Sequence, residues 1–127
     1  MNTTFYISAE RAQFDSKVNA TRTNLLRGLL IASGFSFEEV QGCYHEEGQE
    51  EPSVEVSFKV KTNNQKAIER LAKGFQQDAI LRQDGLLGSL VDFINNQEVY
   101  IGKATHTKEQ PTGCYTRFND GSYMYFR

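Results

Sequence analysis

The sequence predicts an α+β fold of the ferredoxin-like kind: an antiparallel sheet with two helices on one face, in the order β-α-β-β-α-β, and an extra C-terminal β extension. Two stretches carry apolar stripes at helical spacing, and one stretch alternates apolar and polar residues with a period of two. At 127 residues, with 39% hydrophobic and 24% charged residues, the chain fits a single domain over residues 1–127 that can bury a core.

The first two predicted elements are a strand over residues 3–9 and a helix over residues 17–33. The strand alternates around Phe5 and Ile7. The helix repeats its apolar residues at the i, i+3, i+4, i+7 spacing of an amphipathic helix. Gly34 follows as the residue type that most often ends a helix, because it adopts a left-handed backbone without strain.

The next two predicted elements are strands, over residues 35–44 and from Pro52 onward, joined by a polar, acidic loop over residues 45–51. Pro52 suits the first position of a strand, where a missing N–H is tolerated. The strand it opens shows the clearest period of two in the chain. One side carries Val54, Val56, Phe58 and Val60, and the other carries Glu55, Ser57, Lys59 and Lys61.

A second helix and a fourth strand complete the β-α-β-β-α-β order. Asn63 or Asn64 caps this helix, which has one apolar stripe, and the strand covers residues 78–82 before a turn at Asp84-Gly85. The C-terminal extension consists of strands over residues 90–94, 99–104 and 113–126. The last of these contains the hairpin signal Asn119-Asp120-Gly121.

The bulk composition excludes several classes of protein. A formal net charge of −2 argues against electrostatic binding to nucleic acid, which requires a basic face. No apolar run approaches the ~20 residues that span a bilayer, and the first residues do not follow the pattern of a signal peptide. We therefore expect a cytoplasmic protein without membrane or nucleic-acid partners. Cys43 and Cys114 should be reduced there, and together with His45 they lack zinc-site spacing and have ordinary structural roles.

The acidic loop is the most informative polar feature. Its charges suit either a solvated loop that keeps the protein soluble or a pocket for a positive ligand. Tyr44 ends the strand before the loop, so we expect it to lie near Glu51. An aromatic face beside a carboxylate suits a cationic ligand. The loop glutamates are Glu46, Glu47, Glu50 and Glu51.

Aromatic residues are frequent in the tail. They fit either one face of the sheet or a subunit interface, and the core interpretation is the default. The residues are Tyr115, Phe118, Tyr123, Tyr125 and Phe126. The tail also repeats a tripeptide, because Gly42-Cys43-Tyr44 is echoed by Gly113-Cys114-Tyr115.

Taken together, several segments resemble the bacteriophage S-adenosylmethionine hydrolase family, whose members are also described as S-adenosylmethionine lyases. The segments lie in the family's order and cover most of the chain, although residues 84–110 match poorly. The loop between Tyr44 and Glu50 is shorter than in a coliphage member of the family. The matching stretches are FYISA, TRTNLLRGLL, GCYHE, EEPSVEV, ERLAKGFQQDAIL and GCYTRFNDG.

The resemblance implies an enzyme that cleaves S-adenosylmethionine to 5′-methylthioadenosine. The second product is homoserine lactone, or homoserine after hydrolysis, and neither a metal nor an organic cofactor takes part. The resemblance also implies homotrimers of ferredoxin-like subunits with active sites at subunit interfaces. In the host cytoplasm, such phage enzymes drain the methyl donor that restriction–modification enzymes need.

The resemblance also assigns roles to residues. Glu51 matches the second glutamate of the family's paired acids and is expected to hold the α-ammonium or the ribose hydroxyls, with Glu50 the next candidate. Tyr44 is expected to hydrogen-bond Glu51 or to pack on the sulfonium, and Ser8 matches a position near the ligand. In a lyase the substrate's own carboxylate attacks its γ-carbon. In a hydrolase Glu51 acts instead as general base on a water, with a pKa raised by burial or by Glu50.

Three other functions compete with this interpretation. A trimeric regulatory protein that binds an adenosine ligand without turnover would use the same fold, although a nucleotide would require a basic phosphate site. An anti-restriction protein that mimics DNA would be far more acidic than −2. A nucleic-acid-binding ferredoxin-like domain would need a basic sheet face, of which Lys59 and Lys61 give only a trace.

Overall fold

The computed structural model describes residues 3–44 and 53–127. Within these residues the chain forms eight strands and two helices. In chain order the elements are β1 (Thr3–Ile7), α1 (Ser16–Ala32), β2 (Ser36–Tyr44), β3 (Ser53–Lys61), α2 (Gln65–Gly74), β4 (Ala79–Asp84), β5 (Leu87–Asp92), β6 (Gln97–Thr107), β7 (Tyr115–Arg117) and β8 (Tyr123–Phe126). Neither helix is long and apolar enough to cross a membrane.

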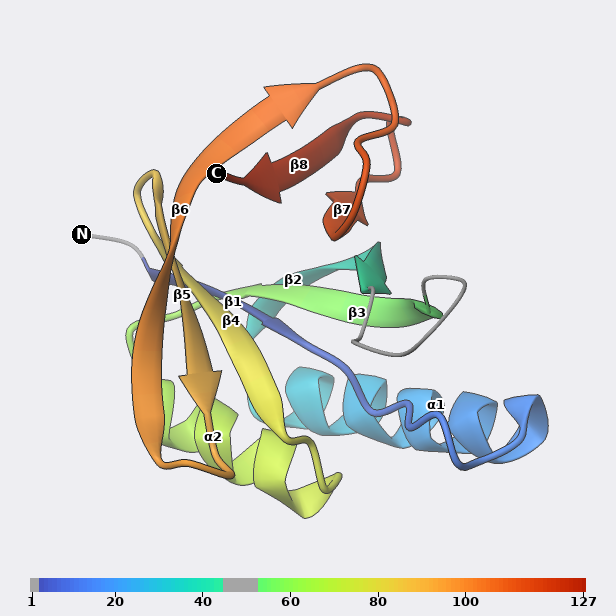
Figure 1. Cartoon of the computed structure of the whole chain (residues 1–127). Helices are drawn as coiled ribbons and strands as arrows, with labels where there is room; N and C mark the ends of the chain where they lie inside the picture. The colour runs from blue at the N-terminus through green and yellow to red at the C-terminus, as the bar shows by residue number, and fades with distance from the viewer. Residues whose placement is uncertain (1–2, 45–52) are drawn as a thin grey trace.

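The described strands form a closed antiparallel barrel in the order β1-β3-β2-β7-β8-β6-β5-β4, and β4 pairs with β1 to complete the ring. The first six elements follow the predicted order. The prediction of a ferredoxin-like sandwich is nevertheless wrong, because the sheet does not stop at β2 and β4. Figure 1 shows β6, β7 and β8 arching over the side of the sheet opposite the helices.

The barrel closes because both strands that would be edges in an open sheet find partners. β4 continues through a tight turn into β5, pairing residues 79–84 with residues 87–92. β2 pairs with β7 over Gln41 to Cys43. An unpaired edge strand presents free N–H and C=O groups to water and to other chains, and closure removes both edges. The predicted C-terminal extension is therefore part of the barrel wall. Its last segment is two strands, β7 and β8, rather than one.

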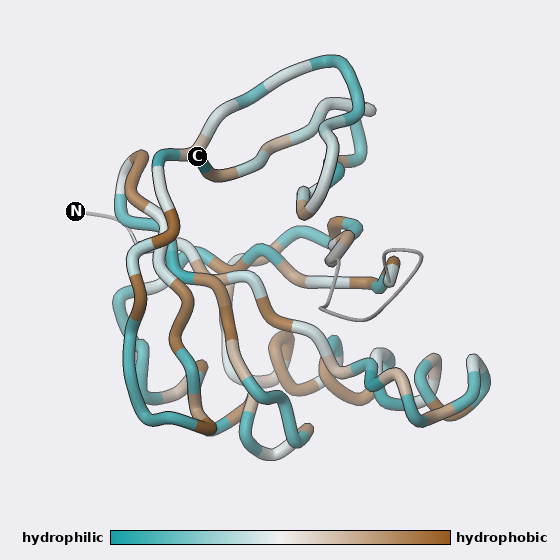
Figure 2. Tube along the Cα trace, in the orientation of Figure 1, coloured by the Kyte–Doolittle hydropathy of each residue, from teal (hydrophilic) through white to brown (hydrophobic). Residues whose placement is uncertain are grey.

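The period of two in β3 separates two buried environments. Phe58 and Val60, which are fully buried, face the helices and pack with Phe5 on β1 and with Leu30 on α1. Ser57 points the other way, into the barrel, and only 2% of its surface is exposed. The predicted alternation is confirmed for these residues, and its polar side faces the interior of the barrel. Figure 2 shows hydrophobic stretches along the strands near the helices and a mostly hydrophilic β6–β7 connection.

The helix ends agree with the sequence. The Asp15 carboxylate caps α1 by accepting from the Val18 N–H at 2.8 Å, and Gly34 ends the helix with φ +75°. Asn64 caps α2 by accepting from the Ala67 N–H at 3.2 Å. The predictions for Gly34 and Asn64 are confirmed, and these caps fix the ends of the helices against the barrel.

A second apolar cluster lies inside the barrel. Tyr6, Val40 and Met124 are buried there and pack against Phe118 and Phe126. The core interpretation is therefore confirmed for these two tail aromatics. This cluster does not fill the barrel, and the space beside it is the candidate site.

Candidate functional site

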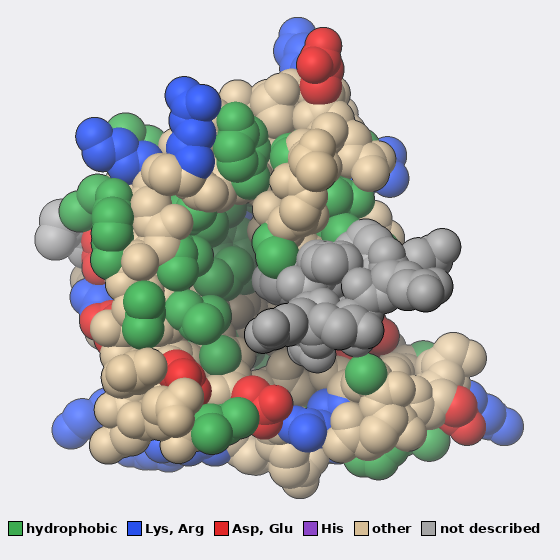
Figure 3. Space-filling view, in the orientation of Figure 1, with side chains coloured by type: hydrophobic (Ala, Val, Ile, Leu, Met, Phe, Trp, Pro, Cys, Tyr) green, Lys and Arg blue, Asp and Glu red, His purple; other side chains and the backbone are tan. Residues whose placement is uncertain are grey.

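A cavity of about 1040 Å³ lies inside the barrel and opens on one face. Figure 3 shows the hollow, with hydrophobic side chains gathered around it and acidic and basic side chains along its lower edge. This volume suits a ligand of drug or nucleoside size. Its lining has an apolar part, made by Tyr6, Leu81, Leu90, Ile101, Met124 and Phe126, and a polar part, made by Glu10, Arg11, Ser53, Glu55, Gln77 and Asp78.

Strand register explains which side chains reach the cavity. Residues opposite one another in a sheet share a face. Tyr6 on β1 lies opposite Leu81 on β4, and Leu81 lies opposite Leu90 on β5, so all three point inward. On β3 the inward residues are Ser53, Glu55 and Ser57, because Phe58 faces the helices. The apolar and polar parts of the cavity therefore come from different strands.

The loop that follows β1 forms one wall and is tied to β3. The Ser8 hydroxyl donates to the Val56 carbonyl at 2.8 Å and accepts from the Glu10 N–H at 3.1 Å. The Glu10 carboxylate in turn accepts from the Val56 N–H. Ser8 is buried, with 4% of its surface exposed. These three bonds fix the position from which Glu10 enters the cavity.

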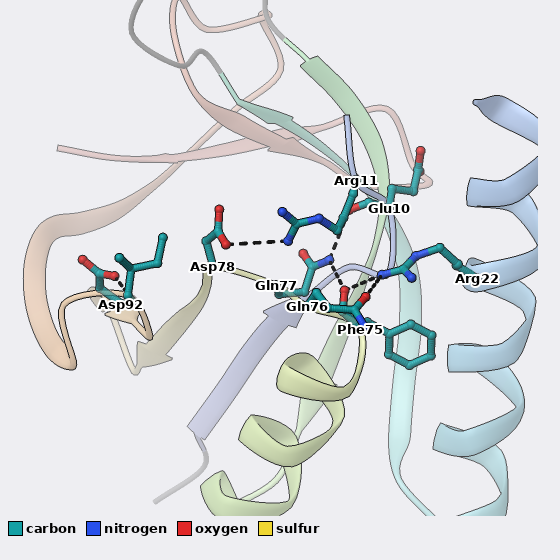
Figure 4. A network of polar contacts seen from close by, with 9 residues as sticks. Glu10, Arg11, Arg22, Phe75, Gln76, Gln77, Asp78 and Asp92 are labelled. Carbon is teal, nitrogen blue, oxygen red and sulfur yellow. Dashed lines mark hydrogen bonds and ion pairs between the residues drawn. The ribbon is translucent and has the colours of Figure 1, made fainter. Parts of the chain in front are cut away.

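Two residues of α1 hold the same loop from the other side. The Asn19 amide accepts from the Arg11 N–H at 2.9 Å and donates to the Arg11 carbonyl at 3.0 Å. Arg22 donates to the Ala9 carbonyl at 2.7 Å and to the Phe75 carbonyl beyond α2. Figure 4 shows Arg22 reaching from α1 to the segment that follows α2, whose Gln77 amide donates to the Glu10 carbonyl at 3.1 Å. Helix α1 thus joins the loop that follows β1 to the segment that follows α2, and these two segments border the opening.

The lining is acidic on balance. Among the described residues it contains three carboxylates, on Glu10, Glu55 and Asp78, and one guanidinium, on Arg11. Arg11 Nη1 lies 3.6 Å from Asp78 Oδ1, and the exposed Asp78 side chain leaves this ion pair screened by water. Such a lining attracts a cation, and its apolar part can cover an uncharged ring system.

Tyr115 reaches the cavity from β7 and has a shifted pKa. A hydrogen bond with the Cys43 side chain, then burial, raises the pKa of the Tyr115 phenol above its ordinary value of 10.0. Its ring also meets Tyr123 edge-on, with centroids 5.3 Å apart. Tyr115 therefore stays protonated in neutral solution and acts as a neutral wall residue.

Of the four site residues predicted from the sequence, the structure describes Ser8 and the backbone of Tyr44 but not Glu50 and Glu51. Ser8 lines the cavity. The backbone of Tyr44 pairs with Ser53, and Ser53 lines the cavity, so both described ends of the acidic segment lie at the same end of the β2–β3 hairpin. Glu50 and Glu51 lie outside the described residues, as do Pro52 and His45. The expected proximity of Tyr44 and Glu51 stays a prediction.

Sequence reasoning missed the polar lining residues Glu10, Arg11 and Asp78. They match no motif. Glu10 and Arg11 directly follow the first predicted strand, and Asp78 opens the fourth. These two strands are neighbours in the predicted sheet. The signal that could have identified the three residues was therefore their position at the same end of two neighbouring strands. Across residues 3–44 and 53–127, no group of three or more His, Cys, Asp or Glu side chains is arranged to hold a metal.

A comparison with protein-family models matches this chain to a known family. The model of the S-adenosylmethionine lyase family matches residues 5–127, which is nearly the whole chain and includes every residue of the cavity lining. Among curated proteins, none matches the chain.

Proposed function

We propose that this chain, which belongs to the S-adenosylmethionine lyase family and is an enzyme that degrades S-adenosylmethionine, forms 5′-methylthioadenosine and homoserine lactone in the barrel cavity. The observation that carries the proposal is the division of the lining. S-adenosylmethionine joins an uncharged nucleoside to a cationic sulfonium and an α-ammonium. The apolar part of the cavity suits the nucleoside, and the acidic part suits the two cations.

The substrate supplies its own nucleophile. Its carboxylate oxygen attacks the γ-carbon, the bond between that carbon and sulfur breaks, and the electron pair returns to sulfur as a neutral thioether. No proton has to move in this step. The protein's task is to fold the flexible methionine chain so that oxygen and carbon approach in line, and such positioning supplies up to about 7–11 kcal/mol in favourable cases.

We assign the catalytic roles to Glu51 and Tyr44 and the supporting binding roles to Glu50 and Ser8, following the family resemblance. Glu51 holds the α-ammonium or the ribose hydroxyls and leaves the substrate carboxylate free. Ser8 donates its hydroxyl proton to Val56 and uses one lone pair for the Glu10 N–H, so one lone pair is left to accept from the substrate. Glu10 and Asp78 add negative charge to the polar part of the cavity lining, near Ser8.

We also propose a homotrimer in which a neighbouring subunit completes each site. The support is a set of large apolar side chains left exposed on β5, β6 and their connecting turns, including Leu86, Ile94 and Tyr100. Exposed apolar residues in such number are typical of a protein–protein interface. Light scattering on the active protein tests this proposal, and a fully active monomer contradicts it.

In a host cytoplasm, the reaction depletes the methyl donor. A phage that carries the enzyme would then escape restriction–modification systems that require S-adenosylmethionine. We propose this role as the biological use of the activity. Cells that express the chain should contain less S-adenosylmethionine than cells that express the Glu51→Gln variant, as measured by mass spectrometry.

The deciding experiment follows purified protein and S-adenosylmethionine by NMR from the first minutes, with heat-denatured protein as the control. We expect methylthioadenosine and homoserine lactone to appear together, with homoserine forming later. Homoserine from the start, without lactone, contradicts the lyase mechanism and makes Glu51 a general base. No turnover at all contradicts the assigned activity.

A further inference from the structure

Ser57 is an exception among the buried polar groups of this protein. Its side chain lines the cavity from β3, and 2% of its surface is exposed. Among the described residues, only the Ser57 hydroxyl and Arg82 Nε are buried side-chain atoms without a hydrogen-bond partner, and Arg82 Nε lies 2.9 Å from the Asp84 carboxylate in an ion pair. Ser57 is thus left with neither kind of partner. Buried polar groups without a partner are rare and costly, so each one requires an explanation.

The surroundings of Ser57 explain why the protein supplies no partner. Its neighbour across the β2–β3 pairing is Val40, which is apolar. The nearby Ser8 hydroxyl already donates to the Val56 carbonyl. A serine hydroxyl can donate one hydrogen bond and accept two, and among the described residues none of this capacity at Ser57 is used.

The position of Ser57 along β3 shows which part of a ligand it meets. Its inward neighbours toward the start of the strand are Glu55 and Ser53, which belong to the polar part of the lining. The next inward position, Lys59, is not a lining residue and pairs with Glu38 at 3.4 Å, but Tyr6, which lies opposite it on β1, belongs to the apolar part of the lining. Ser57 therefore stands where the lining changes from acidic to apolar. A ligand with its cations among the carboxylates places its uncharged nucleoside there.

We infer that the Ser57 hydroxyl hydrogen-bonds the nucleoside half of the substrate and thereby selects for it. The inference rests on the proposed function. Ring nitrogens and ribose hydroxyls of a nucleoside can satisfy a serine hydroxyl, whereas a sulfonium or an ammonium offers it no acceptor. A ligand of equal size without such groups leaves Ser57 buried and without a partner, and this is how a polar group in a pocket discriminates.

The test compares Ser57→Ala with Ser89→Ala. Ser89 lies on β5 outside the cavity lining and gives the same chemical change on another strand. Ser57→Ala removes a hydroxyl without a partner, so we expect a thermal unfolding temperature equal to or above that of the wild type. Inhibition by methylthioadenosine should weaken about tenfold, or about 1.4 kcal/mol, and the KM for S-adenosylmethionine should rise by the same factor with little change in kcat. Ser89→Ala should leave both constants unchanged.

Each other result overturns the inference. A Ser57→Ala protein that is less stable and binds methylthioadenosine normally shows that the hydroxyl serves the fold. A higher KM with unchanged methylthioadenosine inhibition shows that the contact is with the amino-acid half. If Ser57→Ala does not fold, the hydroxyl is structural. Inhibition by methylthioadenosine is then measured on Ser57→Cys, whose thiol is a weaker donor of similar size. Inhibition of Ser57→Cys at the wild-type level also rejects the contact. A wild-type protein that neither cleaves S-adenosylmethionine nor binds methylthioadenosine instead contradicts the proposed function, which separates the two failures.

Discussion

Cys43 lies directly opposite Tyr115 where β2 pairs with β7, and their side chains share a hydrogen bond. This pairing joins the N-terminal half of the barrel to the tail. It also brings together the two segments that repeat Gly-Cys-Tyr in the sequence, because Gly42 lies opposite Thr116 in the same register. The echo in the sequence therefore marks the two strands that meet to close the barrel.

The Cys43–Tyr115 contact predicts the order of tyrosine titration. Removing the thiol in Cys43→Ala should lower the pKa of Tyr115 toward 10.0, because the hydrogen bond with Cys43 is the largest cause of its rise. Because the pKa of Tyr115 is higher in the folded state, the protonated phenol contributes to stability. This contribution is complete below pH 10.0 and is lost as the pH rises through the folded-state pKa. Ultraviolet titration, with Tyr115→Phe used to assign the signal, measures the shift. An unchanged titration in Cys43→Ala contradicts the contact.

Asp120 predicts a pH dependence of stability at the acid end. The Ser122 hydroxyl and N–H both donate to its carboxylate, at 2.6 and 2.8 Å, and these bonds lower the pKa of Asp120 below 3.8. The stabilisation is present above pH 3.8 and is lost as the pH falls through the folded-state pKa. Asp120→Ala should therefore lower the unfolding temperature at pH 7, and the difference should shrink below pH 3.8. A difference that stays constant down to pH 2 contradicts this prediction.

Arg22 predicts a link between helix α1 and the cavity. Arg22→Lys keeps the charge but cannot reach the Ala9 carbonyl, the Phe75 carbonyl and Gln76 together. We expect a loss of about 2 kcal/mol in the free energy of unfolding and a higher KM, because the loop that carries Glu10 and Arg11 loses its anchor. Urea unfolding and steady-state kinetics measure the two effects.

The matched control for Arg22 is Arg70→Lys. Arg70 is exposed on α2, so its replacement should change stability by less than about 0.5 kcal/mol. Equal effects of the two substitutions would show that Arg22 holds nothing in particular.

Gly88 predicts a steric requirement in the cavity wall. A Cβ at this position would lie 2.3 Å from the Phe126 ring, and Phe126 lines the cavity. Gly88→Ala should therefore displace Phe126, cost about 1–3 kcal/mol of stability and weaken substrate binding. Gly28→Ala is the control, because a Cβ on α1 meets nothing within 4 Å and should stabilise the helix by about 0.5–1 kcal/mol. A Gly88→Ala protein with normal stability and KM contradicts the close packing.

Glu51 predicts the largest loss of activity. Glu51→Gln should retain the fold and lower kcat/KM at least about 100-fold, or about 2.7 kcal/mol, because a neutral amide holds an ammonium poorly. Glu46→Gln in the same acidic segment is the control and should retain activity. Tyr44→Phe should lower activity modestly if the hydroxyl only positions Glu51. Near-normal activity of Glu51→Gln removes Glu51 from its role, and unfolding of Tyr44→Phe makes Tyr44 a core residue.

The sequence predicts the local structure of this protein well because local structure depends on neighbouring residues. The helix expected over residues 17–33 is α1 (Ser16–Ala32), and the alternation from Val54 to Val60 marks β3. Closure was missed because it depends on residues far apart, such as Cys43 and Tyr115. An alternating strand shows that it has two faces, but it does not show whether the polar face meets water or the interior of a barrel.

The same limit applies to the site. The acidic residues stood out as a charge cluster in the sequence, whereas Ser8 and the roles of Glu50 and Glu51 came from the family resemblance, which transfers positions along the chain. Glu10, Arg11 and Asp78 were missed because they are ordinary surface residue types, and only the pairing of β1 with β3 and β4 brings them to one opening. Ser57 could not be identified from sequence, because the alternation that places it on the polar side of its strand does not show that this side is buried.

The wall of the cavity is assembled from residues 118 positions apart in the sequence. Tyr6 on β1, the first strand to be synthesised, contacts Met124 on β8, the last. A nascent chain that has reached Asp84 still lacks the 43 residues (127 − 84) that complete the barrel, which takes about 2–9 s at 5–20 residues per second. During that interval β2 and β4 have unpaired edges, which are prone to misassociate. Translation therefore withholds activity until the final strand arrives, and any delay within these codons lengthens the period in which the chain is both inactive and vulnerable to aggregation.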